Sequence, residues 1–197
     1  MAELRTISSN VRIKGTLRTD GALVSPTIKS NFSAANQTGF ATDTLLLGSA
    51  IAMPPGGFVA GSRYTVVLDM VKTAAGTATP IFVVRIGTAG TVADAAILTF
   101  TFAAGTAAVD TGMAIIVAQF RTVGSGTSAV LAGTAEIRHA LAATGLTSLG
   151  ASGQAQVTVV SSGFDSTVAG SIISVSFNGG TSFAGTNTIV NADLRSF

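Results

Sequence analysis

Apolar and polar residues alternate along the stretch Gly61 to Thr73, which reads GSRYTVVLDMVKT. Successive side chains of a β-strand point to opposite sides of the backbone, so an alternation with a period of two is typical of a strand. The apolar side of this stretch holds Tyr64, Val66, Leu68 and Met70. The pattern predicts that a β-module begins here.

Further runs of the same kind follow as far as the C-terminus, separated by loops rich in Gly, Thr and Ala. The eight predicted strands are 63–72, 81–88, 95–102, 112–122, 134–141, 154–162, 171–178 and 186–195. Many short strands with glycine-rich turns predict an all-β fold, and eight is the strand count of a jelly roll. We therefore expect an eight-stranded antiparallel jelly-roll-like sandwich over residues 61–197.

The first 60 residues have a looser pattern, interrupted by Pro26, Pro54, Pro55 and several Gly and Asn residues. Such residues favour turns or extended connections. A long segment without regular structure is unusual inside a compact domain. We expect residues 1–60 to be an extended N-terminal arm and linker, used for anchoring or oligomerisation, that lies on the domain or on a partner chain.

Charged residues make up only 10% of the 197 residues, against roughly 25% in ordinary soluble proteins. Free monomers usually depend on surface charge to stay soluble, so this composition favours a chain that is covered by copies of itself or by neighbours. We expect a homo-oligomer. The absence of cysteine excludes disulfides and thiolate chemistry but leaves the compartment open.

The net charge of +2 is too small to predict nucleic-acid binding. Residues 1–29 carry +3 (five basic, two acidic) and the remainder −1 (six basic, seven acidic), which indicates either a solvated arm or contact with an acidic partner. The 15 uncharged residues between Asp94 and Asp110 fall short of the roughly 20 that a spanning helix needs, so we expect no membrane insertion. The polar N-terminus argues against a signal peptide.

No catalytic motif stands out. His139 is the only histidine, lies in register with Ile137 and Leu141, and has no G-x-S-x-G motif to supply a nucleophile. The acids are scattered about one per hairpin, which favours solvated or loop-capping roles over a glycosidase pair. The G-x-G-x-x-A stretch at 124–129 lacks the following helix of a dinucleotide site and is interpreted as a hairpin loop. We expect no enzyme, cofactor or metal.

Phenylalanines in strands are expected to pack in the core, whereas those in loops or near chain ends are candidates for subunit contacts. The predicted contact residues are Phe58, Phe164, Phe183 and Phe197.

Residues 10–23, NVRIKGTLRTDGAL, resemble short units found near the shafts and attachment ends of tailed-bacteriophage fibres. The resemblance implies an arm that intertwines with sister chains, with a trimer favoured. Within this unit Arg12, Lys14 and Arg18 are the predicted interface residues.

The order GSRYTVVLDM, a Thr/Ala/Gly loop with apolar β-runs, and GTNTIVNADLRSF at the end is similar to terminal β-sandwich modules of tailed-bacteriophage virion proteins. Leu194-Arg195 matches the ending of such modules. The resemblance implies a non-enzymatic virion component, made in the host cytoplasm, that contacts other capsid or tail proteins as a capsid decoration, head fibre or tail fibre. The alternative is a host-surface adhesin or carbohydrate-binding module whose partner is a glycan.

Overall fold

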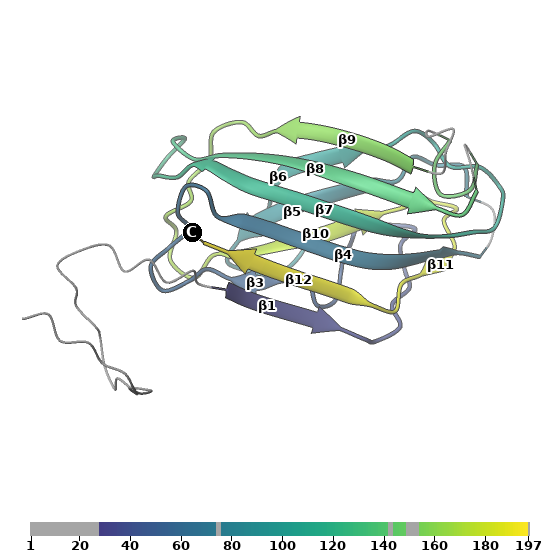
Figure 1. Cartoon of the computed structure of the whole chain (residues 1–197), viewed down its shortest axis with the longest axis horizontal. Helices are drawn as coiled ribbons and strands as arrows, with labels where there is room; N and C mark the ends of the chain where they lie inside the picture. The colour runs from purple at the N-terminus through teal and green to yellow at the C-terminus, as the bar shows by residue number, and fades with distance from the viewer. Residues whose placement is uncertain (1–27, 74–75, 142–143, 149–153, 197) are drawn as a thin grey trace, which may run out of the picture.

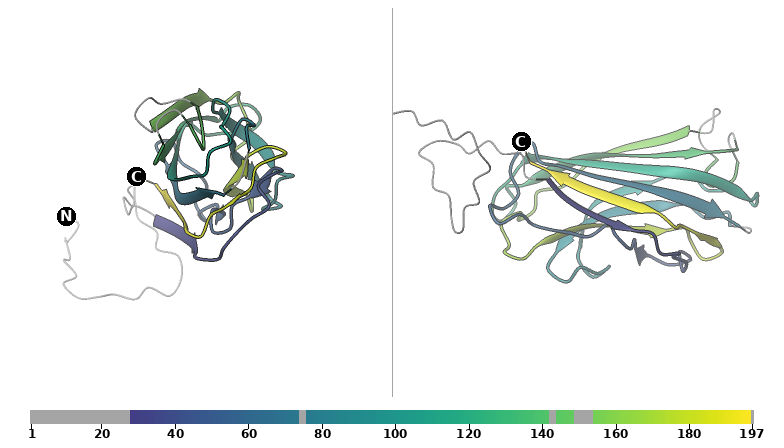
Figure 2. Two further views of the ribbon diagram at one scale, coloured as in Figure 1. Left: turned by 90° about the vertical axis from the view of Figure 1, so that its right-hand side faces the viewer. Right: turned by 60° about the horizontal axis from the view of Figure 1, so that its bottom comes forward.

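The computed structural model describes residues 28–73, 76–141, 144–148 and 154–196. Two antiparallel sheets pack face to face around one apolar core (Figure 1). The end-on view in Figure 2 shows the two layers enclosing this core. Within the described part of the chain no helix is long and apolar enough to cross a membrane.

The larger sheet has seven strands. Its order across the sheet is β1 (Ile28–Ser33), β12 (Val190–Arg195), β4 (Arg63–Lys72), β7 (Asp110–Thr122), β8 (Val130–His139) and β9 (Gln154–Val160). The short strand β11 (Gly185–Thr186) also pairs with β4. The edge strands are therefore β1 and β9, at the bottom and top of Figure 1.

The smaller sheet has five strands. Its order is β2 (Thr44–Leu45), β10 (Ile172–Asn178), β5 (Ile81–Gly87) and β6 (Ala95–Thr101), and β3 (Ile51–Ala52) pairs with β10 beside β2. Strand β6 contacts β8 and β9 of the larger sheet, so the two layers come close along that side.

The predicted antiparallel sandwich is confirmed, with twelve strands among the described residues where eight were expected, and each of the eight predicted runs overlaps a strand of the structure. Strands β5 and β6 form a hairpin, and β7, β8 and β9 form a three-strand meander. The likeness to a jelly roll therefore lies in the two-layer architecture and not in the order of the strands. Residues 123–129 connect β7 to β8, which confirms the hairpin-loop interpretation of the glycine-rich motif.

Part of the predicted arm and linker belongs to the sandwich. Strand β1 pairs with β12 along its whole length, while β2 and β3 pair with β10. Residues 28–60 therefore contribute three strands to the two sheets. Residues 1–27 lie outside the described residues.

Alternation along the strands builds the core. Tyr64, Val66, Leu68 and Met70 of β4 are all buried on the inner face, as the pattern predicts. Burying one such side chain stabilises the fold by roughly 1.5–3 kcal/mol, so the inner faces of the central strands supply much of the driving force. The Tyr64 hydroxyl donates a hydrogen bond to the Ser49 carbonyl, and burial raises the pKa of Tyr64 far above its ordinary value.

Candidate assembly surface

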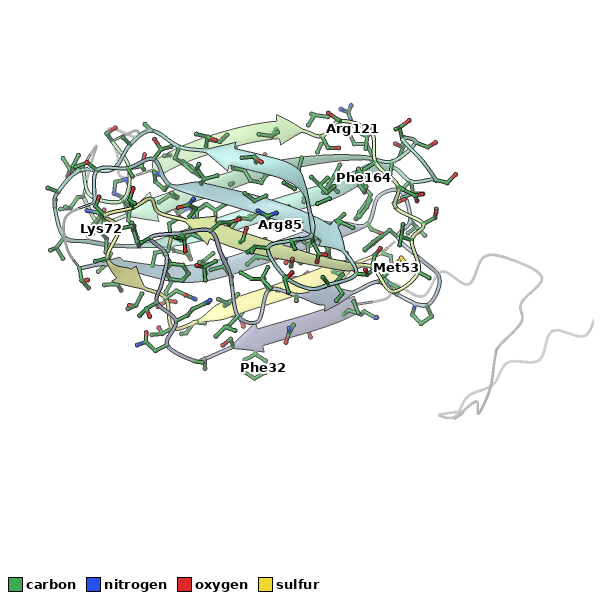
Figure 3. The ribbon with its side chains drawn as sticks, turned by 180° about the vertical axis from the view of Figure 1, so that it is seen from behind. Phe32, Met53, Lys72, Arg85, Arg121 and Phe164 are labelled. Carbon is green, nitrogen blue, oxygen red and sulfur yellow. The ribbon has the colours of Figure 1, made fainter. Side chains whose placement is uncertain are left out.

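Strand β1 forms an edge of the larger sheet and follows directly on residues 1–27. The side chains of β1 on the outer face of the sheet are Ile28, Ser30 and Phe32. Their register partners on β12 are the three residues of that strand's outer face, Arg195, Asp193 and Asn191. Ile28 is 60% exposed and Phe32 is 72% exposed. Figure 3 shows the Phe32 ring projecting from the edge, away from the body of the sandwich. A strand edge with exposed apolar side chains and no charge on its outer face is a template for pairing with another chain.

The inner side of β1 is fixed by polar side chains. Lys29 Nζ donates hydrogen bonds to the carbonyls of Ala52 (3.0 Å) and Met53 (3.1 Å). Asn31 Nδ2 donates to the carbonyl of Ala50 at 2.8 Å. These carbonyls lie in and around β3, so the bonds join the edge of one sheet to the edge of the other. Strand β1 is thereby held from inside while its outer edge stays open.

A glycine makes this packing possible at the far end of β1. Gly48 has φ of +83°, and a Cβ atom there would lie 2.4 Å from the backbone nitrogen of Ser33. Both the backbone angle and the close approach require glycine. The loop after β2 therefore lies directly against the end of the edge strand.

The predicted interface phenylalanines lie elsewhere. Phe58 and Phe183 are 5% and 9% exposed and belong to the chain's own core. Phe58 stacks on Phe120, and Phe183 makes an edge contact with Phe177. Phe164 is partly buried and packs beside Phe120. Packing within one chain thus accounts for all three rings, although each lies in or near a loop.

The other predicted interface residues are Arg12, Lys14, Arg18 and Phe197, and all four lie outside the described residues.

The sequence prediction misses Ile28 and Phe32 because it assigns residues 1–60 to a loosely patterned arm and linker. Ile28 and Phe32 do fall on one side of a period-two pattern and Lys29 and Asn31 on the other, but polar Ser30 interrupts the apolar side. The signal is short, and here the polar side chains face inward. Because the polar side chains lie on the inner side, the pattern does not identify this segment as a strand of the sandwich.

A buried polar cluster lies at the end of the sandwich where β4 ends and β7 begins, the end marked by Lys72 in Figure 3. His139 Nδ1 lies 2.8 Å from Asp110 Oδ2, and both side chains are fully buried. The same carboxylate accepts hydrogen bonds from the backbone N–H groups of Leu146 (2.9 Å) and Leu141 (3.3 Å). Asp110 therefore holds the segment that follows β8.

Lys72 completes this cluster. Its Nζ donates to the carbonyls of Thr106 and Ala108, and its register partner across the sheet is Asp110. Burial lowers the pKa of Lys72, and the nearby Asp110 carboxylate acts in the opposite direction. The amine is committed to backbone carbonyls, so the cluster ties the loop 106–108 to β4.

The cluster resembles a catalytic His–Asp pair in its geometry. Among the described residues, no hydrogen-bond partner lies at His139 Nε2. A serine-type mechanism needs a hydroxyl within hydrogen-bond reach of that nitrogen. The neighbouring glycine also explains the tight burial, because a Cβ at Gly145 (φ +85°) would clash with the Asp110 carboxylate. Among the described residues, Asp110 joins His139 of β8 to the backbone of Leu141 and Leu146.

Two of the remaining acids cap loops. Asp94 accepts hydrogen bonds from the N–H groups of Ala89, Gly90 and Thr91, and Asp165 accepts from Thr167, which are loop-capping roles as predicted. In the part of the chain that the structure covers, no three His, Asp or Glu side chains come together as a metal site would require. Arg85 of β5 forms an ion pair with Asp43, and no local sequence pattern connects the two residues.

A hollow of about 360 Å³ opens at the opposite end, near Met53. Glycine, proline and small polar residues line most of it, together with Met53, Phe58 and Val123. The Ser166 hydroxyl in its wall is already hydrogen-bonded to Gly124, and the Phe58 ring is stacked on Phe120. These walls offer neither a charged side chain nor a free aromatic face to a ligand.

Comparison with known proteins gives no family. No known protein family matches the sequence, and no curated protein matches it. Two solved structures of infectious bursal disease virus were aligned. A mutant VP2 protein from derived T=1 particles has 8% identity over 86% of this chain and 40% of that chain, with a TM-score of 0.22. The Gx strain structure has 9% identity over 87% and 42%, with a TM-score of 0.20. The chain thus spans about two-fifths of the length of both structures, and these TM-scores do not establish a common fold.

Proposed function

We propose that this chain is a non-enzymatic structural component of a virion, of the tailed-bacteriophage kind that the sequence resembles. It assembles with copies of itself through its N-terminal arm and presents the sandwich on the capsid or the tail. The observation that carries the proposal is the open edge at β1. This edge strand exposes Ile28 and Phe32, and it follows directly on the basic N-terminal arm.

Two further features support an assembly role. Charged residues are few, so a free monomer would have little charge to keep it apart from other copies. The most reaction-like side chains, His139, Asp110 and Lys72, are buried and bonded to the fold itself. The surface is therefore better suited to contact than to chemistry.

Particle composition tests this proposal. The copy number of the chain in purified particles would be measured by mass spectrometry, for the full chain and for a deletion of residues 2–26. The deletion stops before Ile28, so that β1 is retained. We expect the full chain in a fixed copy number and a loss of about tenfold or more for the deletion, which corresponds to about 1.4 kcal/mol of binding free energy. Absence of the full chain from particles, or equal incorporation of the deletion, would contradict the proposal.

A further inference from the structure

The hydrogen-bonding pattern of β12 determines which backbone groups of β1 are free. The Ile189 carbonyl accepts the N–H of Asp69, so it faces β4. Antiparallel strands alternate the side to which their backbone groups point, so Val190 faces β1. Val190 pairs with Ser33, and the register then directs Lys29, Asn31 and Ser33 towards β12. Ile28, Ser30 and Phe32 consequently point their N–H and C=O groups away from the sheet.

One of these outward groups already has a partner. Phe32 N–H donates to Asn31 Oδ1 at 2.9 Å, which agrees with its outward direction. Within the described residues, no hydrogen bond is recorded for the N–H groups of Ile28 and Ser30 or for the carbonyls of all three residues. The outer edge of β1 therefore offers several unpaired backbone groups in a row, on the same strand that carries two exposed apolar side chains.

We infer that this edge binds the β1 strand of a second copy, antiparallel and centred on Ser30. In this register Ser30 lies opposite its own counterpart, and Ile28 lies opposite Phe32. Ser30 exchanges both backbone hydrogen bonds with its counterpart, and each Ile28 N–H reaches the Phe32 carbonyl of the other copy. The Asn31–Phe32 bond stays intact. Aromatic and β-branched side chains directly opposite each other stabilise such a pair, so the edge is complementary to itself.

The point at which residues 1–27 join the sandwich favours a second copy as the occupant. In the two-fold pair each arm leaves beside Ser33 of the other copy and can follow that copy's surface. To cover β1 of its own chain, the arm must instead reverse just before Ile28. The residue before a proline is biased towards extended backbone, so Ser25-Pro26 favours a chain that continues outward. Fully extended, this segment reaches about 90 Å, enough to span a neighbour.

The strand pair alone is small for a stable interface. Stable interfaces bury about 1,200–2,000 Å² in total, more than a pair of six-residue strands supplies. The strand pair sets the register, and contacts outside the two strands must supply the remaining area. The inference therefore rests on the proposed assembly role, and it names the surface and the partner.

Cysteine cross-linking tests the register, because the chain contains no cysteine of its own. Opposed residues that exchange both hydrogen bonds have Cα atoms about 5.5 Å apart, inside the 4.4–6.8 Å range of disulfides. Purified full-length Ser30→Cys should form a covalent dimer under mild oxidation. Phe32→Cys should not, since its counterpart lies about 14 Å away along the strands. A mixture of Ile28→Cys and Phe32→Cys should yield the mixed dimer.

Val160→Cys, on the other edge strand of the same sheet, measures random collision. The inference is supported if Ser30→Cys cross-links at least about tenfold faster than Val160→Cys and the mixture gives the mixed dimer. It is overturned if Ser30→Cys does not exceed Val160→Cys, or if Phe32→Cys alone cross-links equally fast. The assay uses purified protein, so it is independent of whether the chain enters particles.

Discussion

Two regions of this molecule place polar and apolar side chains in opposite environments. At the end of the sandwich around Asp110, charged side chains are buried and bonded within the chain. At the β1 edge, the apolar side chains of Ile28 and Phe32 are exposed. Lys29 and Asn31 occupy the inner positions instead and bond to carbonyls of the opposite sheet.

This difference suggests that the Asp110 region determines the stability of the fold and that the β1 edge determines association between chains. Buried charges that lose a partner are costly, so the Asp110 region fixes the fold. Exposed apolar groups on an edge contribute little to the fold of one chain, but they gain when a second chain covers them. Substitutions in the two regions should therefore affect different measurements.

The largest effect on folding is expected at Asp110. Asp110→Ala removes the partner of His139 and leaves the N–H groups of Leu141 and Leu146 without an acceptor. A buried donor left without an acceptor costs about 1–3 kcal/mol, so losing these contacts together should cost about 3 kcal/mol or more. Urea unfolding should report this loss. Asp193→Ala is the matched control, because its pair with Arg195 lies at the surface and should cost at most about 1 kcal/mol. An equal loss of unfolding free energy in the two variants would contradict the structural role assigned to the Asp110 region.

A smaller effect is expected from Asp69, which anchors the start of β12 beside β1. Burial acts to raise the pKa of Asp69, but hydrogen bonds from Thr188 and Ile189 outweigh it and lower that pKa below 3.8. A lowered carboxyl pKa stabilises the fold above the unfolded-state value, and this contribution is lost as the pH falls through the folded-state value. Asp69→Asn should therefore show a smaller drop in unfolding free energy than wild type between pH 6 and pH 3. An unchanged drop would contradict the assignment.

The sequence predicts the central strands well, because β4, β7 and β8 bury one face and so alternate clearly. The sequence prediction fails where the apolar side of a segment is not the buried side, or where burial depends on distant strands. Strand β1 turns Lys29 and Asn31 towards its inner side and exposes Phe32, so its pattern does not indicate an inner face. Phe58 and Phe183 follow turns and look exposed in sequence, yet distant strands supply the rings that they pack on. The pairs Asp110–His139 and Arg85–Asp43 depend on long-range register, which local patterns do not encode.

The central claim is that copies of the chain meet at the β1 edge. Sedimentation velocity over a concentration series, on the full chain and on Phe32→Lys and Val160→Lys, tests it most directly. Both substitutions place a lysine at an exposed apolar position of an edge strand, with Val160 51% exposed on β9. The predicted result is an oligomer for wild type and Val160→Lys, and association at least about tenfold weaker for Phe32→Lys with unfolding free energy within about 0.5 kcal/mol of wild type. A monomeric wild type, or a Phe32→Lys variant that associates as strongly as wild type, would contradict the claim.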